Sequence, residues 1–336
     1  MTTAVSAIII LGLLILFHEL GHFSVAKLVG MKVHEFAVGM GPKIIKFTKG
    51  ETLYTLRALP IGGYVKLEGE DQKSEDKRAF GNKPLIARIA VLFAGAAMNF
   101  ILGFLIFLIL MSGTPQIITP VIEEVMPDMP AAEAGLMPGD RIEKLDSTRV
   151  NIHKDIIFFL DMNGAQPIDV TIVREGGRKV LQIVPAIHPE YGRYMFGYSP
   201  KLAETTIINA IKYAYYDTVF YTKFIFVHLG TLFRGQGTFE DVSGPVGIVG
   251  AIGGAARAGI EPLMILAAII SINLGIFNLL PIPALDGSRI MFLLLEGIRR
   301  KPIDPEKEGL VHMIGLAMLL LLMVFATFND ITRLIR

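Results

Sequence analysis

A short motif, His18-Glu19-Leu20-Gly21-His22, lies inside an apolar run that covers residues 4–29. A run of this length can cross a bilayer as a helix, which needs about 20 residues. Histidines four residues apart share one helix face and can hold one metal ion, and the adjacent glutamate can take a proton from a metal-activated water. Charged side chains cost roughly 2.5 to 3.5 kcal/mol at the centre of a membrane helix, so they are rare there without a function. On a soluble helix chance would explain the motif equally well, but inside a span it predicts a metal site.

The composition fits a chain that is part membrane and part water-soluble. Of 336 residues, 52% are hydrophobic and 19% are charged, which is too apolar for an ordinary soluble protein and too charged for one buried wholly in lipid. The net charge of +1 leaves no excess of cations for phosphates, so we expect no nucleic-acid partner. With no cysteine in the chain, His, Asp or Glu must hold any metal.

Three further apolar runs, 89–111, 263–285 and 310–328, are long enough to span, which predicts four transmembrane helices. Lys and Arg are frequent between the first and second runs and at 299–301, so these loops are expected on the cytoplasmic side. Both termini and the segment after the second run are then expected outside. Two C-terminal arginines oppose this orientation.

Residues 31–88 are predicted to form a small membrane-associated β-hairpin region. Strand-like stretches occur at 33–38, 43–47 and 52–59, with turn signals at 39–42 and 60–63. Their side chains are too apolar for free solution, so we expect hairpins that lean on protein at the membrane. The charged stretch 69–82 is expected to be a solvated loop.

A water-soluble α+β insert is predicted after the second apolar run. Strands are expected at 141–145, 168–174 and 179–185, and a helix at 153–163. The stretch 130–140 reads as a short helix and a tight turn into a strand. Its Ala-Gly-Leu-x-x-Gly-Asp pattern resembles a bacterial PDZ domain, which implies a peptide or chain end bound by strand addition. A spacer domain without a ligand is the alternative.

The segment 205–233 carries an apolar stripe at helical spacing, which predicts a helix in the outer membrane interface. A fifth span is the alternative, but it would place 299–301 outside. Residues 244–247 are expected to be a loop before a glycine-rich segment.

A catalytic zinc usually has three protein ligands, and Asp286 is the best candidate for the third. It follows Pro281 and Pro283, which prevent a regular helix and present the carboxylate from an irregular segment near the membrane surface. Glu296 is expected to pair with Arg299 or Arg300 instead. The other histidines are weaker candidates, and His312 is the least implausible of them: His34, His153, His188, His228 and His312.

Together the two motifs resemble the site-2 protease family of intramembrane zinc metalloproteases. The resemblance rests on His-Glu-x-x-His in the first span and on Asn-x-x-Pro-x-Pro-x-x-x-x-Asp-Gly at 278–287. Further matches at 39–42, 60–66, 93–99 and 243–248 extend it over the whole chain. With one PDZ insert, the chain is similar to the bacterial branch that is related to the regulator of sigma-E protease.

The resemblance implies a role for each motif residue. Zn²⁺ would be held by His18, His22 and Asp286, and Glu19 would act on the water. The implied substrate-binding residues are Asn273, Asn278, Pro281 and Pro283 beside the metal, and Gly62, Gly63, Tyr64 and Val65 in a strand that pairs with the unwound substrate. Implied substrates are single-pass transmembrane proteins, usually anti-sigma factors and remnant signal peptides, cut in the bacterial inner membrane.

The sequence therefore predicts a multi-pass α-helical membrane protein with four transmembrane helices, a β-hairpin region and a PDZ-like domain. A metal transporter and an inactive relative that binds through its PDZ domain are the competing functions. The predicted order is a first transmembrane helix at 1–30, the β region and loop at 31–88, a second helix at 89–112, the PDZ-like domain at 113–200, an interfacial helix and glycine-rich segment at 201–261, a third transmembrane segment at 262–298, and a loop with the fourth helix at 299–336.

Overall fold

The computed structural model describes residues 2–70, 72, 74–235, 243–301, 303 and 305–335. The chain divides into two compact units, which are described separately. One unit is Met1–Ile106 with Tyr221–Arg336, and the other is Phe107–Phe220.

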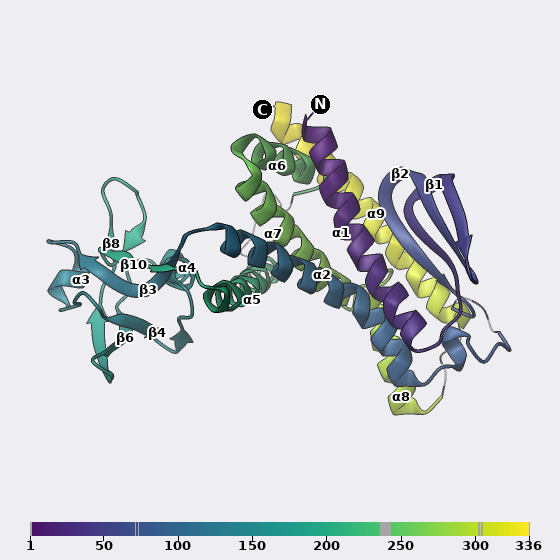
Figure 1. Cartoon of the computed structure of the whole chain (residues 1–336), viewed down its shortest axis with the longest axis horizontal. Helices are drawn as coiled ribbons and strands as arrows, with labels where there is room; N and C mark the ends of the chain where they lie inside the picture. The colour runs from purple at the N-terminus through teal and green to yellow at the C-terminus, as the bar shows by residue number, and fades with distance from the viewer. Residues whose placement is uncertain are drawn as a thin grey trace. The chain divides into compact units, whose positions relative to one another are not determined.

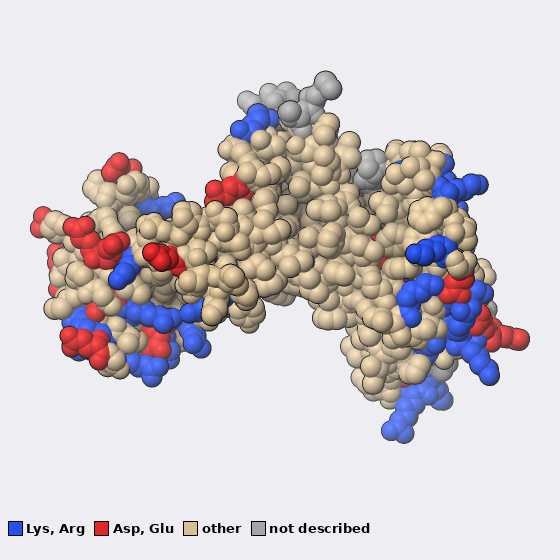
Figure 2. All heavy atoms as spheres, in the orientation of Figure 1, with Lys and Arg blue, Asp and Glu red and all other residues tan. Residues whose placement is uncertain are grey.

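Four helices of the described chain are long and apolar enough to cross a membrane. They lie within α1 (Thr2–Leu28), α2 (Leu85–Gly113), α7 (Ile260–Leu279) and α9 (Pro305–Ile335). Figure 2 shows few charged side chains over the central region of the molecule, where Figure 1 places α1, α2 and α7. The four predicted apolar runs thus correspond to four candidate membrane helices.

The third run is not one continuous helix. α7 ends at Leu279, and α8 (Asp286–Arg299) begins seven residues later. Pro281 and Pro283 occupy the connecting segment, as expected from residues that cannot continue a helix. Glu296 of α8 pairs with Arg88 of α2 at 2.5 Å, so the predicted pairing with Arg299 or Arg300 is wrong. A tertiary partner is nearer than the local ones.

α1 is packed closely on two sides. A β-carbon at Gly21 would lie 2.2 Å from the Ala94 carbonyl oxygen of α2, so only glycine permits this approach. α6 (Pro245–Ala258) packs against α1 near Thr3. The expectation of a loop over 244–247 is wrong, because Pro245 starts this helix, a position where proline's missing N–H costs nothing.

β1 (Val33–Lys49) and β2 (Thr52–Leu67) form a curled sheet beside α1 (Figure 1). The strands are longer than predicted and run through both expected turns. Gly39, Gly41 and Gly62 have positive φ, and the register shifts there. These glycines therefore make bulges that curl the sheet, where sequence patterns indicated chain reversals.

Residues 35–38 of β1 pair with two parts of β2, 53–56 on one side and 63–66 on the other. The segment 62–67 is consequently an edge of this sheet. Glu35 of β1 is buried and accepts hydrogen bonds from Arg57 (2.8 Å), Thr55 (2.8 Å) and Lys43 (3.2 Å). Burial opposes ionisation of Glu35, but these donors outweigh it and lower its pKa to about 2.

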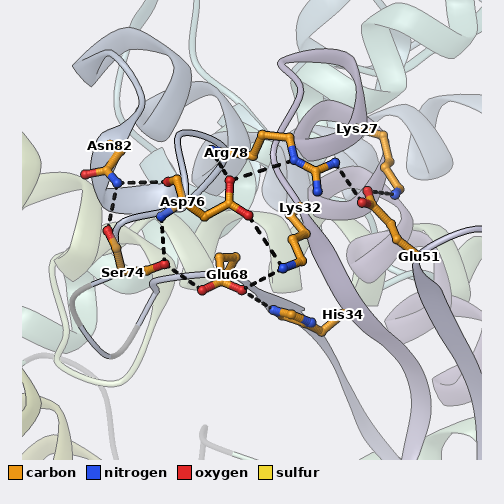
Figure 3. Close-up of polar contacts among 9 residues, drawn as sticks. All are labelled: Lys27, Lys32, His34, Glu51, Glu68, Ser74, Asp76, Arg78 and Asn82. Atoms are coloured by element: carbon orange, nitrogen blue, oxygen red, sulfur yellow. Dashed lines mark hydrogen bonds and ion pairs between the residues drawn. The ribbon is translucent and has the colours of Figure 1, made fainter.

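The loop after β2 is exposed at many of its residues, as predicted, but ion pairs and hydrogen bonds also tie it down (Figure 3). Glu68 is its centre, because it accepts hydrogen bonds from Ser74 (2.6 Å) and contacts the His34 ring nitrogen at 2.5 Å. These bonds lower the pKa of Glu68 to about 2. Lys32 bridges Glu68 and Asp76 at 3.3 and 3.5 Å, so the start of β1 is fixed to the loop.

The second unit is built on a sheet of order β10-β3-β4-β6-β7, with β5 paired to β4. The predicted strands and helix are confirmed, although β7 begins and ends two residues earlier than expected. β3 and β10 were not predicted; each contains a proline, which weakens a strand pattern. The elements are β3 (Gln116–Val125), α3 (Pro130–Glu133), β4 (Arg141–Leu145), β5 (Thr148–Arg149), α4 (His153–Asn163), β6 (Ile168–Arg174), β7 (Gly177–Ile183), β8 (Ala186–Ile187), β9 (Tyr194–Met195) and β10 (Tyr198–Glu204).

The core of this unit lies between the sheet and α4. Ile142, Ile172 and Ile156 are at most 1% exposed within it. Asp140 is also buried and is held by Arg174 through two hydrogen bonds of 2.7 Å. The Gly-Asp end of the PDZ-like pattern is therefore an internal anchor.

α5 (Ile207–Phe233) follows β10, as the apolar stripe predicts. It is not among the candidate spans of the described chain on length and composition. Ile207, Ile208 and Tyr215 are exposed on it. An interfacial helix agrees with these features and stays a prediction.

Candidate active site and metal centre

The structure brings the two motif histidines and Asp286 together, although 264 residues separate His22 from Asp286. Asp286 Oδ2 lies 3.4 Å from His18 Nε2 and 3.3 Å from His22 Nε2. The two Nε2 atoms are 3.1 Å apart. Among the residues that the structure describes, no other group of three His, Cys, Asp or Glu side chains could hold a metal ion.

These spacings fit a zinc ion. Zn–N and Zn–O bonds of about 2.0–2.1 Å at tetrahedral angles separate any two ligand atoms by about 3.3 Å. Asp286 Oδ2 is buried and accepts no well-formed hydrogen bond within the described chain. The donor set of two imidazoles and one carboxylate also leaves a fourth position open, as in catalytic rather than structural zinc sites.

A glycine of α2 makes room for the imidazoles. A β-carbon at Gly95 would lie 2.3 Å from His22 Nε2 and 2.8 Å from His18 Cε1. The backbone of α2 also orients one ring, because His22 Nδ1 lies 2.8 Å from the Val91 carbonyl oxygen. The two histidines of α1 therefore pack against the backbone of α2.

α9 holds the segment that presents Asp286. Ala284 has a φ of +76°, which is unusual for alanine, and its N–H donates to His312 Nδ1 at 3.0 Å. A β-carbon at Gly315 would lie 2.2 Å from Pro283 Cβ, so α9 touches the segment there. His312 therefore contacts the backbone of the segment and is not a member of the ligand cluster.

Glu19 is 9% exposed and lies between the histidines and the sheet. A β-carbon at Gly63 would lie 2.8 Å from Glu19 Cγ and 2.9 Å from the Ala37 carbonyl oxygen. The edge segment of β2 thus passes directly beside the carboxylate. Only a glycine allows so close an approach.

The other predicted substrate-binding residues lie in two places. Gly62, Gly63, Tyr64 and Val65 belong to the edge segment, where Tyr64 hydrogen-bonds Arg57 and Val65 packs into the core below. Asn273 lies in α7 with its Oδ1 buried and without a partner in the described chain. Asn278, Pro281 and Pro283 lie in the last turn of α7 and the segment before Asp286.

A family model described as peptidase family M50 matches residues 6–322. The chain belongs to peptidase family M50. A Clostridium acetobutylicum protein, provisionally named a zinc metalloprotease, is 41% identical over 328 residues, 97% of this chain and 96% of the relative. The regulator of sigma-W protease RasP of Bacillus subtilis is 34% identical over 419 aligned positions, 99% of each chain. The zinc metalloprotease RasP of Geobacillus kaustophilus is 33% identical over 413 positions, 98% of this chain and 97% of the relative.

This M50 peptidase is a zinc metalloendopeptidase of the site-2 protease type, which disfavours the transporter and the inactive relative. It is shorter than the Bacillus subtilis protein, since 419 aligned positions minus 336 residues leaves at least 83 without a counterpart here. A PDZ domain of an SdrC-like protein from Listeria monocytogenes is similar over 24% of this chain and 86% of that one, at 19% identity and a TM-score of 0.23.

Several residues around the site had no predicted role. Gly95 and Asn99 fall within the family match at 93–99, but their contacts with the imidazoles come from the packing of α2 on α1. A lone asparagine in an apolar span is a signal that could have marked Asn99, because a polar side chain in lipid is costly. The sequence offers His312 only as a weak ligand candidate, and nothing in it marks Gly315.

Proposed function

We propose that this M50 peptidase cuts single-pass membrane proteins within their transmembrane segment, near its cytoplasmic end. Anti-sigma factors and remnant signal peptides are the substrates that the family and the name of the Bacillus subtilis relative suggest. The convergence of His18, His22 and Asp286 within 3.1–3.4 Å carries the proposal. Because the cluster lies on apolar helices, its metal-binding side chains are positioned to reach a peptide bond inside the membrane.

In this proposal His18, His22 and Asp286 hold zinc through their Nε2, Nε2 and Oδ2 atoms. When bound, zinc supplies Lewis-acid activation of the attacking water and of the scissile carbonyl. Glu19 would act as the general base toward the attacking water and then as the proton donor to the leaving amine. Its buried position beside the histidines keeps bulk water from competing for the proton.

The edge segment 62–65 supports a way of opening a helical substrate. A transmembrane helix hides its amides in internal hydrogen bonds, so it must unwind before it can be attacked. An extended substrate could add to the free edge of β2, with its backbone brought alongside Glu19 at Gly63. Asn273 and Asn278 would then bind the substrate backbone from the α7 side.

The second unit (Phe107–Phe220), called the sheet unit from here on, is proposed to act as a filter on the outer side of a bacterial inner membrane. The positive-inside distribution of Lys and Arg supports this orientation, and the lipid bilayer covers the apolar helices. A PDZ-like domain there would bind a peptide or chain end, or exclude substrates whose outer part is still large. The scissile bond would then face the cytoplasmic half of the membrane.

Glu19→Gln tests the proposal. The variant keeps the shape and burial of the side chain but cannot take a proton, so turnover is expected to fall by about 10²- to 10⁴-fold. The measurement is cleavage of a single-pass substrate by the full chain in liposomes, with zinc content measured on the same preparation. Glu124→Gln, an exposed carboxyl of β3, is the matched control and should cleave normally. Unchanged turnover in Glu19→Gln would remove the assignment.

A further inference from the structure

Asn99 is the one polar residue near the middle of α2, and its side chain reaches the proposed zinc ligand His18. It is 0% exposed, and its Nδ2 atom is placed 3.2 Å from His18 Nδ1. Its Oδ1 atom is buried and has no partner in the described chain. A buried amide on an apolar helix is costly unless it has a partner or a function.

Zinc binding to one imidazole nitrogen determines that the other nitrogen of a neutral ring carries the proton. If Nε2 gives its lone pair to the metal, a neutral ring must carry its proton on Nδ1, and that proton needs an acceptor. His22 meets this condition, because its Nδ1 lies 2.8 Å from the Val91 carbonyl oxygen. The corresponding acceptor for His18 must come from Asn99, which lies next to His18 Nδ1.

The need for an acceptor at His18 Nδ1 determines which way the side-chain amide of Asn99 is turned. Oxygen and nitrogen of a side-chain amide are told apart by their hydrogen bonds, and rotation by 180° exchanges them. Internal bonding favours neither orientation of Asn99, since each leaves one amide atom without a protein partner. With zinc on Nε2, only the orientation with Oδ1 toward Nδ1 provides an acceptor.

We propose that Asn99 is a positioning residue for the zinc site, whose side-chain oxygen accepts the Nδ1–H of His18 and fixes the ring with Nε2 toward the metal. The inference rests on the zinc site proposed above. α2 then orients both imidazoles, one through a backbone carbonyl and one through Asn99. Ser271 of α7 holds the backbone of the same residue, since its Oγ donates to the Asn99 carbonyl at 2.8 Å.

The test compares zinc affinity in variants that change one atom type at a time. Asn99→Leu has a similar volume and no acceptor, and its zinc dissociation constant is expected to rise by about 10- to 100-fold. Asn99→Asp keeps an oxygen at the same place and is expected to bind zinc within roughly threefold of the unmodified protein. The affinity is measured on the full chain in detergent by competition with a chromophoric chelator.

Ser112→Ala is the matched control. It removes an exposed hydroxyl of the same helix that donates to the Leu108 carbonyl at 2.7 Å, contacting neither Asn99 nor an imidazole, so zinc affinity should be unchanged. An Asn99→Leu protein that binds zinc as tightly as the unmodified one would overturn the proposal. So would an Asn99→Asp protein as weak as Asn99→Leu, because that result would assign the contact to the nitrogen.

Two further measurements keep the outcomes separate. If Asn99→Leu fails to fold, Asn99→Asp alone decides, since an acceptor role predicts retained zinc and a donor role predicts lost zinc. The visible spectrum of the cobalt-substituted proteins reports ligand geometry independently of proteolysis. If the unmodified protein holds zinc and cleaves substrate, a failed test contradicts only the role of Asn99. If the unmodified protein holds no zinc, this proposal and the proposed function are both overturned.

Discussion

At the scale of single residues, the site depends on glycines that leave space as much as on the side chains that would bind the metal. Gly95 has no side chain where the two imidazoles lie, and Gly63 has none where Glu19 lies. Polar ligands and small residues have to come together, because a metal site at the contact of two helices needs both donors and space. Each of these glycines is tested most directly by adding one methyl group.

Gly95→Ala is expected to abolish tight zinc binding. The new methyl group would lie 2.3 Å from His22 Nε2, so at least one imidazole must leave its place. We expect zinc affinity to fall by more than about tenfold and cleavage to fall with it.

Gly12→Ala is the control within α1, because a β-carbon there meets nothing within 4 Å. It should keep full zinc binding and gain up to about 1 kcal/mol of stability from the better helix propensity of alanine. Equal zinc affinities in the two variants, measured by chelator competition, would contradict the crowding argument.

At the scale of elements, two segments are held in place by side chains from elsewhere. The curled sheet keeps its edge beside Glu19 because Glu35 links β1 to Thr55 and Arg57 of β2. The segment before Asp286 keeps its shape because α9 contacts it at Pro283 and Ala284. Both contacts can be weakened without touching a proposed ligand.

Glu35→Gln should destabilise the sheet and change its response to pH. The lowered pKa means that Glu35 stabilises the folded state above the unfolded carboxyl's pKa of about 4.5, and that this contribution is lost as pH falls toward about 2. The variant is expected to lose about 1–2 kcal/mol near neutral pH and to lack this acid-dependent loss. Thermal unfolding in detergent from pH 7 to pH 3 measures both. Parallel pH profiles for the variant and the unmodified protein would refute the assignment.

Gly315→Ala is expected to weaken zinc binding from the far side of the site. Its methyl group would lie 2.2 Å from Pro283 Cβ and force α9 and the Asp286 segment apart. We expect a fall of about tenfold in zinc affinity. Gly309→Ala, on the same helix and with nothing within 4 Å, should bind zinc normally. A normal affinity in Gly315→Ala would show that α9 does not support the site.

At the scale of the whole molecule, helices carry the proposed chemistry and a separate sheet unit carries the proposed selection of substrates. The chain enters and leaves the sheet through neighbouring strands, since Gln116 of β3 pairs with Glu204 of β10. Paired residues on adjacent strands are about 5 Å apart, so a short linker could replace everything between them. The two roles can therefore be separated in one experiment.

Replacing residues 116–204 by a short Gly-Ser linker should leave zinc binding intact. If the sheet unit excludes substrates with large outer parts, the variant will cleave long and shortened forms of one membrane substrate at similar rates. The unmodified protein is expected to prefer the shortened form. Liposome cleavage of both forms by both proteins measures the ratio, and an unchanged preference would contradict a filtering role.

The sequence by itself determined the features that repeat at short range. A spacing of four residues places His18 and His22 on one helix face, and the length of apolar runs indicates four candidate membrane helices. Two prolines predict the break before Asp286, and strand-like runs predict β4, β6 and β7 of the second unit but not β3 or β10. Each of these follows from the geometry of a single element.

Only the tertiary structure decided which residues of different elements meet. The bulged edge beside Glu19, the space at Gly95, the amide of Asn99 next to His18 and the pairing of Glu296 with Arg88 all join segments between 44 and 208 residues apart. No local pattern records such contacts, because they depend on how closely the backbones approach and on which side chains lie at the crossing. The physical reason is that sequence periodicity determines which face of a helix or strand is apolar, whereas tertiary packing determines which other element that face contacts.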